Sequence, residues 1–390
     1  MCGIVGFNFE DKDLLSRMLK KLNHRGPDDS GQYIDRFISL GNTRLSIIDL
    51  DSGKQPIFNE DKSIVIVFNG EIFNYKELRS KLEPKHKFYT NSDTEVIIHL
   101  YEEFSEKLFD YLDGQFAFAI WDSNRKKILL GRDHIGICPL YYYFKNNQLI
   151  FSSEIKSILE VGNLEFNSNI LNNYLQNGYI NSNETIIKDI LKLGPGKFLI
   201  FQNDNVSIQK YNWLEINYPK KLSKDTIIKI TSEEIKKSTI SDVPIGLYLS
   251  GGLDSNVICS SLDKDILKNI KSFTVNFNDS SVPNESNYAK LTAEKYNLKH
   301  FEINYSVKDV LKNFNKITYY LDQPIADPAS FSYFFLSKKA AKEKTKVVLS
   351  GIGGDEVFCG YPQYRLIYYW RHIIHSSVVK NLSLMLFKLY

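Results

Sequence analysis

Short apolar runs separated by polar turns characterise the first half of the chain. Runs of strand length recur at residues 4–9, 63–68, 115–121, 127–132, 149–152 and 197–201, and turn signals such as Asp113-Gly114 separate many of them. Residues 93–104 instead show a helical pattern, with Ser92 or Asp93 as the expected N-cap. The apolar stripe of this helix consists of Val96, Ile97, Leu100, Tyr101 and Phe104. We expect an α+β sandwich in this half.

Strands and helices alternate in the second half of the chain. Residues 206–224 are polar, contain Pro219 and are predicted to be a linker. Beyond it, expected strands at 245–249, 272–277, 300–303 and 346–350 alternate with expected helices at 225–238, 254–262, 287–296, 307–321 and 329–342. This alternation predicts an α/β parallel-sheet domain, which binds ligands beyond the carboxyl ends of its strands. The predicted domains are therefore residues 1–205 and 225–390.

Composition and charge exclude several classes of protein. The 390 residues exceed what one hydrophobic core usually holds, which supports two domains. A net charge of +3 gives no concentrated basic surface for nucleic acid, and every apolar run is too short to span a membrane. The first residues do not resemble a secretory signal, and the four scattered cysteines show no metal-ligand spacing. We expect a reduced, cytoplasmic setting without nucleic-acid or membrane partners.

Cys2 follows the initiator methionine and is the first candidate for chemistry. If Met1 is removed, Cys2 carries both a thiol and the α-amine of the chain, whose ordinary pKa of about 8 suits a base near neutrality. The amine can take the thiol proton, and the thiolate can then attack an amide carbon. A small buried thiol near a chain end is the alternative.

Four short motifs follow the N-terminal Cys-Gly-Ile-Val-Gly in order. They are residues 24–28 (His-Arg-Gly-Pro-Asp), 44–49 (Arg-Leu-Ser-Ile-Ile-Asp), 69–71 (Asn-Gly-Glu) and 92–95 (Ser-Asp-Thr-Glu). Together they resemble the glutaminase domain of class II, or N-terminal-nucleophile, glutamine amidotransferases. The resemblance covers nearly all of residues 1–200 and implies an N-terminal nucleophile hydrolase-like fold that hydrolyses glutamine.

Three of these residues suit the bond-breaking step. Cys2 would be the nucleophile, and hydrolysis creates a tetrahedral oxyanion that needs fixed hydrogen-bond donors. Asn69 and Gly70 are expected in a turn after a strand, from which a side-chain amide and a backbone N–H could serve as those donors. An ordinary hairpin turn is the alternative for Asn-Gly.

Other motif residues suit recognition of glutamine, which is a zwitterion. Arg44 can bind its α-carboxylate with two parallel hydrogen bonds. The resemblance implies Asp93 for the α-ammonium, with Glu71 as a further candidate, although Asp93 could also be a helix N-cap. Residues 24–28 form either a loop over the site or a structural turn. The resemblance further implies glutamine contacts from Leu45, Ser46, Ile47 and Ile48.

A glycine-rich loop lies between an expected strand and an expected helix, and consists of Ser250, Gly251, Gly252, Leu253, Asp254 and Ser255. Small residues let the backbone approach a phosphate, which hydroxyl and N–H groups at a helix N-terminus can bind. The loop lacks the signatures of Walker A and dinucleotide-binding loops. It resembles the pyrophosphate loop of enzymes that cleave ATP to AMP and pyrophosphate. A generic glycine turn is the alternative.

A second such loop, residues 349–356, follows another expected strand. The two loops would face one crevice, where Asp254 and Asp355 could hold Mg²⁺ on the pyrophosphate; loop capping is the alternative for Asp355. With this loop the resemblance extends to glutamine-hydrolysing asparagine synthetases and to an adenine-nucleotide-hydrolase-like fold. It implies an acceptor loop near residues 322–328. It also implies ATP contacts from Leu249, Val275, Ser350 and Gly351.

The resemblance implies that aspartate is converted to asparagine through β-aspartyl-AMP, with glutamine and ATP as the other substrates. Adenylation supplies the leaving group that a carboxylate lacks, and a dry path between the domains would keep ammonia unprotonated. Residues 133–142 and 152–154 are candidates for the domain interface, although core packing is equally consistent. A homodimer is a candidate assembly.

Two features depart from the asparagine synthetase pattern. Ile352 stands where that pattern usually has an acidic residue, so another carboxylate, such as a uronic acid of a surface polysaccharide, is an alternative acceptor. Only thirty-four residues follow Glu356, so we expect the second domain to be truncated at its C-terminus. A truncated, non-catalytic glutaminase-like binding module is a third hypothesis. Cys138, Cys259 and Cys359 are expected to be buried thiols.

Overall fold

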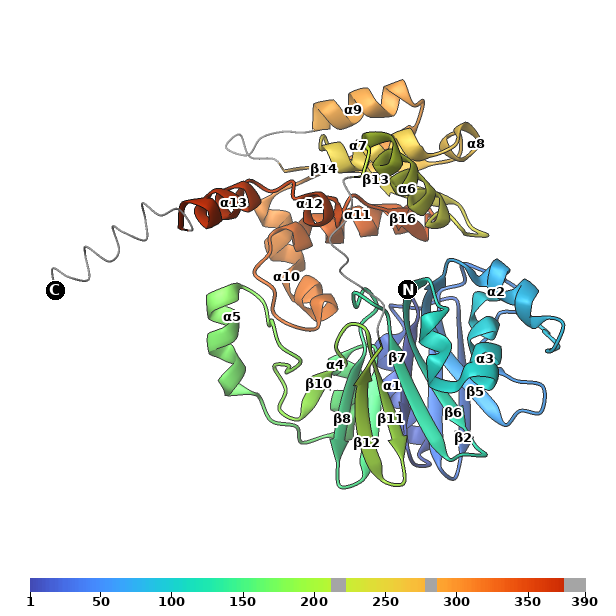
Figure 1. Cartoon of the computed structure of the whole chain (residues 1–390). Coiled ribbons are helices and arrows are strands. Elements are labelled where there is room, and N and C mark those ends of the chain that lie inside the picture. Colours follow the sequence, from blue (N-terminus) through green and yellow to red (C-terminus); the bar gives the residue numbers. More distant parts are fainter. Residues whose placement is uncertain (212–221, 278–285, 375–390) are drawn as a thin grey trace.

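The computed structural model describes residues 1–211, 222–277 and 286–374. These residues form two lobes (Figure 1): a lower lobe of two stacked β-sheets and an upper lobe around one parallel sheet. The two fold classes predicted from the sequence, an α+β sandwich and an α/β parallel sheet, are confirmed.

Both sheets of the lower lobe are six-stranded, and their paired strands are antiparallel. The first has the order β10-β8-β9-β1-β3-β2, formed by Ile190–Lys192, Tyr141–Lys145, Gln148–Ser152, Gly3–Phe7, Ile38–Arg44 and Asp29–Asp35. The second has the order β12-β11-β7-β6-β5-β4, formed by Asn205–Lys210, Lys197–Gln202, Lys127–Arg132, Gly114–Asp122, Ile64–Ile72 and Ile57–Phe58. Cys2 therefore immediately precedes an inner strand, β1.

Helices cover the outer face of each sheet, which gives four layers. Helices α1 (Lys12–Leu22) and α4 (Ile155–Ile158) pack on the first sheet, and α2 (Tyr75–Leu82) and α3 (Asp93–Phe104) pack on the second. The remaining helical segments of this lobe are Ser105–Asp110, Leu159–Val161, Ser168–Ile170 and α5 (Leu171–Asn177).

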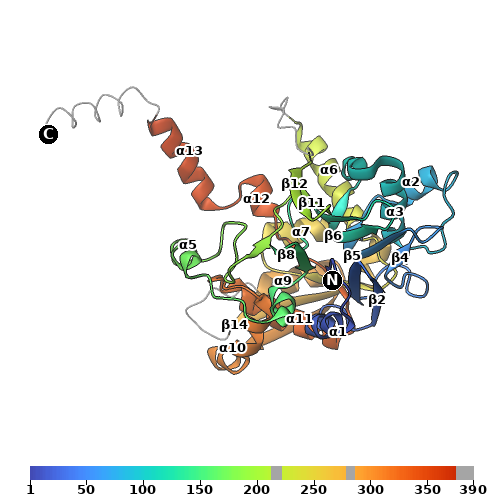
Figure 2. The ribbon, with the colours of Figure 1, turned by 90° about the horizontal axis from the view of Figure 1, so that it is seen from below.

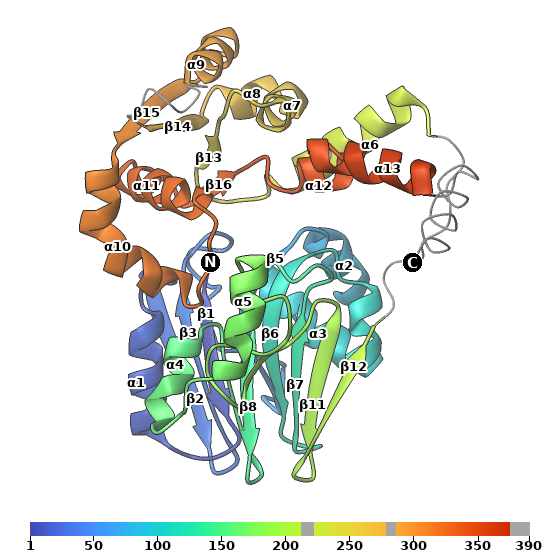
Figure 3. The ribbon, with the colours of Figure 1, turned by 90° about the vertical axis from the view of Figure 1, so that its left-hand side faces the viewer.

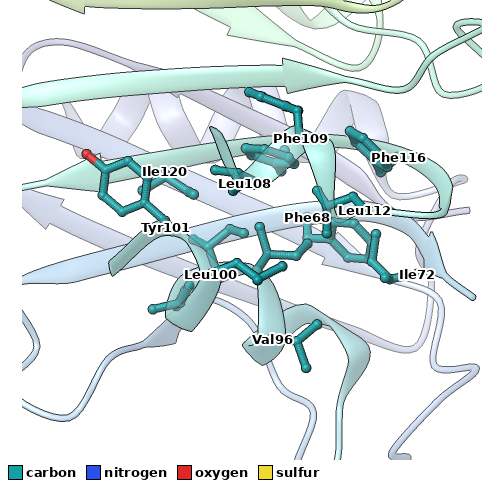
Figure 4. Packing of buried hydrophobic residues seen from close by; sticks show 14 of the residues in the cluster. Phe68, Ile72, Val96, Leu100, Tyr101, Leu108, Phe109, Leu112, Phe116 and Ile120 are labelled. Carbon is teal, nitrogen blue, oxygen red and sulfur yellow. The ribbon is translucent and has the colours of Figure 1, made fainter. Parts of the chain in front are cut away.

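Residues of β5 alternate between two hydrophobic cores because successive side chains of a strand point to opposite faces. Ile66 and Phe68 belong to the core under α3, whereas Val65 and Val67 belong to the core between the sheets. Figure 4 shows part of the first core, made by Phe68, Ile72, Val96, Leu100, Tyr101, Leu108, Phe109, Leu112, Phe116 and Ile120. These two cores fix the position of β5, which carries part of the candidate site.

The upper lobe contains four parallel strands in the order β15-β14-β13-β16, formed by Lys299–Tyr305, Lys271–Phe277, Ile245–Tyr248 and Val347–Leu349. Its helices are α6 (Lys224–Lys237), α7 (Leu253–Ser261), α8 (Lys264–Leu267), α9 (Ser286–Lys295), α10 (Val307–Leu321), α11 (Ala329–Lys342), α12 (Gly354–Phe358) and α13 (Pro362–Ile374). Helices α7 and α9 pack on one face and α11 on the other. The strand order reverses between β13 and β16, which is where such sheets bind ligands.

Two helices of the upper lobe extend beyond its sheet. Helix α10 reaches down towards the sandwich in Figures 1 and 3, and α13 projects away from both lobes in Figures 1 and 2. Within the described segments, no helix combines the length and the apolar character needed to cross a membrane.

The interval predicted as a linker is partly structured. Strand β12 occupies Asn205–Lys210 because it pairs with β11 along its whole length, and Ser223 already caps helix α6. The rest of that interval, residues 212–221, lies outside the described residues, as do residues 278–285 and the chain end at 375–390 on which the predicted truncation falls.

Candidate active sites

Cys2 is held through both its backbone and its thiol. The Leu45 N–H donates a hydrogen bond to Cys2 Sγ at 3.4 Å, and Arg25 Nε donates to the Cys2 carbonyl oxygen at 2.9 Å. Burial raises the pKa of the Cys2 thiol, against the opposing effect of the α-ammonium nearby. Burial also lowers the pKa of that α-ammonium, which belongs to Met1 here. With Met1 present, the thiol is therefore protonated at neutral pH and lies close to an amine.

Asn69 and Gly70 lie inside β5, so the expected turn after a strand is wrong. They pair with Ala117 and Phe116 of β6. Asn69 is fully buried, and neither polar atom of its side-chain amide has a partner within the described protein. A Cβ atom on Gly70 would lie 2.1 Å from the carbonyl oxygen of Gln115, so only glycine lets β5 and β6 approach this closely. The strand thus presents a fixed amide that lacks a protein partner.

Two acidic side chains, Glu71 of β5 and Asp93 of α3, influence each other in buried surroundings. The Ile72 N–H donates to Asp93 Oδ2 at 2.9 Å, whereas Glu71 Oε2 has no hydrogen-bond partner among residues 1–211, 222–277 and 286–374. Burial, followed by the charge of Asp93, raises the pKa of Glu71 well above its ordinary value, and burial raises the pKa of Asp93. Ser92, and not Asp93, caps α3 by accepting from the Thr94 N–H. The pair of carboxylates favours a bound cation.

Arg44 ends β3 and is almost fully buried. Its Nη2 donates to the carbonyl oxygens of Ile48 at 3.0 Å and Asp49 at 2.7 Å. Both bonds use Nη2, which both parallel donor pairs of a guanidinium include, so Nη1 would act as a single donor to a carboxylate while these bonds hold. These bonds hold residues 45–49 as a loop around the guanidinium, with Leu45 directed to Cys2. The side chain of Arg44 therefore holds the predicted segment, residues 44–48, in one conformation.

Residues 24–28 link Cys2 to a buried carboxylate, Glu154. His24 Nε2 and Arg25 Nη1 lie 3.0 and 2.9 Å from Glu154 Oε1, and Lys156 Nζ lies 2.5 Å from Oε2. Burial favours the neutral carboxyl group, but His24, Arg25 and Lys156 outweigh it and hold the pKa of Glu154 at about 2. The loop is thus anchored to the segment that follows β9.

The first glycine-rich loop of the upper lobe connects β13 to α7, as expected. The Ser255 hydroxyl lies 3.1 Å from Ser250 Oγ and 3.2 Å from the Gly252 carbonyl oxygen. Gly252 immediately precedes α7, whose first-turn N–H groups have no partners within the helix. The loop therefore provides donors of the kind that bind phosphate oxygens.

The second glycine-rich loop, after β16, packs directly on the first. A Cβ atom on Gly354 would lie 2.4 Å from Asp254 Cγ, and one on Gly351 would lie 2.9 Å from Asp254 Cβ. Burial, followed by the charge of Asp355, raises the pKa of Asp254. The structure thus brings the two predicted metal-ligating carboxylates together, and their oxygen donors fit Mg²⁺.

The residues expected to contact the adenosine part of ATP differ in their backbone hydrogen bonds and in their exposure. The Leu249 N–H donates to the Phe273 carbonyl oxygen at 2.9 Å, and the Leu249 carbonyl oxygen accepts from Thr274 Oγ1 at 2.5 Å. The backbone of Leu249 is therefore engaged by β14, whereas Val275 is half-buried within that strand. Ser350 and Gly351 open the second loop, in which Ile352 is 69% exposed.

A cavity of about 1140 Å³ lies between the lobes. Near Cys2 its lining includes Met1, Arg25 and Leu45, and in the upper lobe it includes Tyr248 and Val348 from the strands that precede the two loops. Helices α10 and α11 and the segment between them supply Ile317, Tyr320, Leu321, Ile325, Asp327, Tyr333, Phe334, Ala340 and Ala341. The cavity therefore lies between the two predicted sites.

The segment after α10 makes buried contacts with the lower lobe. Asp322 accepts from the Lys156 N–H at 3.1 Å and lies 3.0 Å from Lys156 Nζ, and Gln323 Nε2 donates to the Tyr141 hydroxyl at 3.3 Å. Tyr141 and Glu154, the latter lining the cavity, fall in the two segments predicted as interface candidates, so that interpretation is confirmed for these positions.

Sequence reasoning missed two residues of the upper lobe that contact the glutaminase loops. Lys346 lies 2.7 Å from Asp28, and Asp242 accepts from the Asp49 N–H at 2.7 Å. Neither belongs to a motif, so no sequence signal pointed to them. Among the remaining cysteines, Cys138 and Cys259 are buried as expected, but the prediction for Cys359 is wrong because it is exposed.

The chain matches two family models: "Glutamine amidotransferase domain" over residues 1–212 and "Asparagine synthase" over residues 229–385. It is 37% identical over 381 residues to glutamine-hydrolyzing asparagine synthetase 1 of Bacillus subtilis, covering 94% of this chain and 60% of that protein. It is 35% identical over 394 residues to putative glutamine-hydrolyzing asparagine synthetase 2 of Methanocaldococcus jannaschii, covering 93% and 76%.

A third relative is named as an amidase and not as an asparagine synthetase. The chain is 32% identical over 405 residues to "Amidase chry2" of Gibberella zeae, covering 94% of this chain and 60% of that protein. The chain thus spans about three-fifths of the length of the Bacillus and Gibberella relatives.

Proposed function

Because this chain belongs to the family of glutamine-hydrolysing asparagine synthetases, we propose that it hydrolyses glutamine at Cys2 and uses the ammonia to amidate a carboxylate activated by ATP. The observation that carries the proposal is the buried side-chain amide of Asn69, which has no hydrogen-bond partner among the described residues and lies on the same strand as Glu71. Such an amide is costly to a fold unless a ligand satisfies it. Glu71 and Arg44 both act electrostatically on the Cys2 thiol, which supports one common site.

Glutamine recognition follows from the charges around that site. Arg44 Nη1 would donate a charge-assisted hydrogen bond to the α-carboxylate. Glu71 and Asp93 would bind the α-ammonium, and the cation would offset their mutual repulsion. The α-ammonium of glutamine would thus supply the positive charge that offsets these two buried carboxylates.

The first reaction needs a base for the Cys2 thiol. After removal of Met1, the α-amine would belong to Cys2 and take the thiol proton, so that the thiolate attacks the side-chain carbonyl of glutamine. Asn69 Nδ2 and the Gly70 N–H would stabilise the resulting oxyanion. The oxyanion would collapse to a thioester as the C–N bond breaks, and the α-ammonium would return its proton to the departing ammonia. Water would then hydrolyse the thioester to glutamate and the free Cys2 thiol.

The second reaction would take place beside the paired glycine-rich loops. The α7 N-terminus and the hydroxyls of Ser250 and Ser255 would bind the pyrophosphate part of ATP. Asp254 and Asp355 would hold Mg²⁺, which neutralises phosphate charge when bound. Aspartate is the proposed acceptor: its β-carboxylate would attack the α-phosphate of ATP, releasing pyrophosphate and forming β-aspartyl-AMP, from which ammonia would displace AMP. The cavity between the lobes would carry ammonia away from bulk water.

A second acceptor class deserves a direct comparison because Ile352, an exposed apolar residue, occupies the second loop. Isoleucine offers no charge at this position, and a relative named as an amidase aligns over 94% of this chain. Another carboxylic acid, such as a uronic acid, is therefore the competing proposal for the acceptor.

The test combines glutamine labelled with ¹⁵N in its amide, ATP, Mg²⁺ and either aspartate or a uronic acid. We expect glutamate, AMP, pyrophosphate and ¹⁵N-asparagine from the aspartate mixture. Pyrophosphate with the uronic acid but not with aspartate would replace the acceptor and keep the amidotransferase. Absence of glutamate from protein with a free Cys2 amine would favour a binding module. Cys2→Ala is the control, because it should abolish use of glutamine while leaving use of added ammonium salts.

A further inference from the structure

Two histidines and two glutamates gather around α3, apart from the residues assigned to glutamine. One ligand atom from each of Glu60, His86, His99 and Glu102 lies within 4.8 Å of all the others. Glu60 comes from the turn between β4 and β5, His86 from the segment after α2, and the other two from α3. We propose that these four side chains bind a late first-row divalent cation, with zinc as the natural occupant.

The spacing of the ligand atoms fits a tetrahedral ion. His86 Nδ1 lies 3.5 Å from Glu102 Oε2, and His99 Nδ1 lies 3.8 Å from Glu60 Oε2 and 2.8 Å from Glu102 Oε2. Metal–ligand bonds of about 2.0–2.1 Å in a tetrahedron place neighbouring ligands roughly 3.3 Å apart. These three distances scatter around that value, so small movements would bring the ligand atoms into a coordination sphere.

The other ring nitrogen of each histidine faces a second carboxylate. His86 Nε2 lies 3.3 Å from Glu103 Oε1, and His99 Nε2 lies 3.7 Å from Glu95 Oε1. Metal-bound histidines usually donate this second N–H to a carboxylate, which fixes the tautomer and directs the free nitrogen to the metal. Both Nδ1 atoms point into the cluster; His86 Nε2 has this carboxylate partner, whereas His99 Nε2 lies beyond hydrogen-bond distance of Glu95.

The ligating carboxylates are oriented as well. Asn59 Nδ2 donates to Glu102 Oε1 at 2.8 Å, which leaves Oε2 for the cluster. The Lys87 N–H donates to Glu60 Oε1 at 2.9 Å. Because the non-ligating positions already have partners, the site is held in place by its surroundings.

A network of ion pairs between protonated histidines and glutamates is the competing interpretation. It stacks two charged rings, whose centroids lie 4.5 Å apart. A divalent cation removes this repulsion, since it supplies the same two positive charges and binds neutral imidazoles.

The position of the cluster indicates a structural role. It ties a turn and a loop to α3, whose first residue is Asp93 and whose Glu95 also accepts from the Tyr89 and Thr90 N–H groups. A metal here would therefore hold the start of α3 in place.

Cobalt provides a direct probe, because tetrahedral Co²⁺ absorbs visible light much more strongly than hydrated Co²⁺. We expect the tag-free, full chain to bind one equivalent of Co²⁺ with a tetrahedral spectrum that Zn²⁺ displaces, and Zn²⁺ to raise the melting temperature. His86→Gln and Glu60→Gln should each abolish the spectrum, and Glu103→Gln should weaken binding by about 10–100-fold. Glu60 is 37% exposed, which makes its variant the one least able to disturb folding.

Two controls exclude other binding sites. His300→Gln removes a histidine of β15, and Cys2→Ala removes the reactive thiol; both should keep the spectrum. A spectrum unchanged in folded His86→Gln and Glu60→Gln, or no stoichiometric uptake of Co²⁺ and Zn²⁺ by the unaltered chain, would overturn the proposal.

Discussion

At the scale of single residues, the buried position of Asn69 is unfavourable for folding but suits a role in catalysis. Its amide is fully buried and has no hydrogen-bond partner in the part of the chain that the structure describes, a situation that usually costs about 1–3 kcal/mol. A residue kept at such a cost is expected to interact with a ligand. The absence of a side chain at its neighbour Gly70 is explained by packing, because a Cβ atom there would collide with β6.

Replacing Asn69 with Ala should lower the kcat for glutamine hydrolysis by about 100–1000-fold, because one oxyanion donor is lost. The free energy of unfolding should stay unchanged or rise, since an unpaired buried amide is removed. Steady-state kinetics and chemical denaturation measure the two effects. A kcat close to that of the unaltered chain would contradict the assigned role.

The carboxylates of Glu71 and Asp93 make glutamine binding depend on pH. Burial raises the pKa of both groups, so they take up protons as the pH falls and lose the charge that binds an α-ammonium. KM for glutamine should therefore rise as the pH decreases from about 8 to about 5.5. Asp93→Asn should show a higher KM with a weaker pH dependence. A KM that stays constant over this range in the unaltered chain is the contrary result.

The sequence indicated which residues belong to the candidate site more reliably than it indicated the secondary structure around each of them. The sequence motifs pointed to Cys2, Arg44, Asn69 and Asp93, and the structure gathers them around β1, β3, β5 and α3. The motifs did not show that Asn69 lies within a strand, because Asn-Gly is a strong turn signal. Pairing with β6 overrides that local preference.

At the scale of elements, predictions succeeded where two signals coincided. Helix α3 begins and ends as predicted, at Asp93 and Phe104, because an apolar stripe and the Ser92 cap agree. Strand β12 was missed because its residues are mostly exposed and polar, and only pairing with β11 holds them extended. Helix α1 carried an apolar stripe, with Leu15, Met18 and Leu22 buried, that could have revealed it.

The two glycine-rich loops act as one element, and Gly354 tests this. A side chain at Gly354 would lie 2.4 Å from Asp254 Cγ, so Gly354→Ala should push the loops apart. We expect ATP-dependent pyrophosphate release to fall at least tenfold, while glutamine hydrolysis at the other site continues. Measuring both activities in one preparation supplies the control. Equal loss of both would indicate general unfolding instead.

At the scale of the whole molecule, the relation between the lobes was the least predictable feature. The contacts that join them involve Asp322, Lys156, Lys346 and Asp28, which lie far apart in the sequence and, except for Asp28, outside the glutaminase motifs. Their pairing depends on how α10 and β16 are placed by the parallel sheet. Sequence patterns describe local structure and carry no such long-range information.

The contacts between the lobes should differ in strength according to their burial. The side chains of Asp322 and Lys156 are 8% and 10% exposed, whereas those of Lys346 and Asp28 are 36% and 28% exposed. Asp322→Asn should therefore uncouple the two activities more than Lys346→Gln, because exposed ion pairs contribute only about 0–1 kcal/mol. The ratio of glutamate formed to amide product measures the uncoupling. A larger effect of Lys346→Gln would refute this ranking.

The central claim is that one terminal residue supplies both the nucleophile and its base. The most direct measurement determines the N-terminus of the purified chain by mass spectrometry and then its release of glutamate from glutamine. We predict a chain that starts at Cys2 and produces glutamate, and a Cys2→Ala variant that produces none above background. Active protein that keeps Met1, or undiminished glutamate release by the variant, would contradict the account.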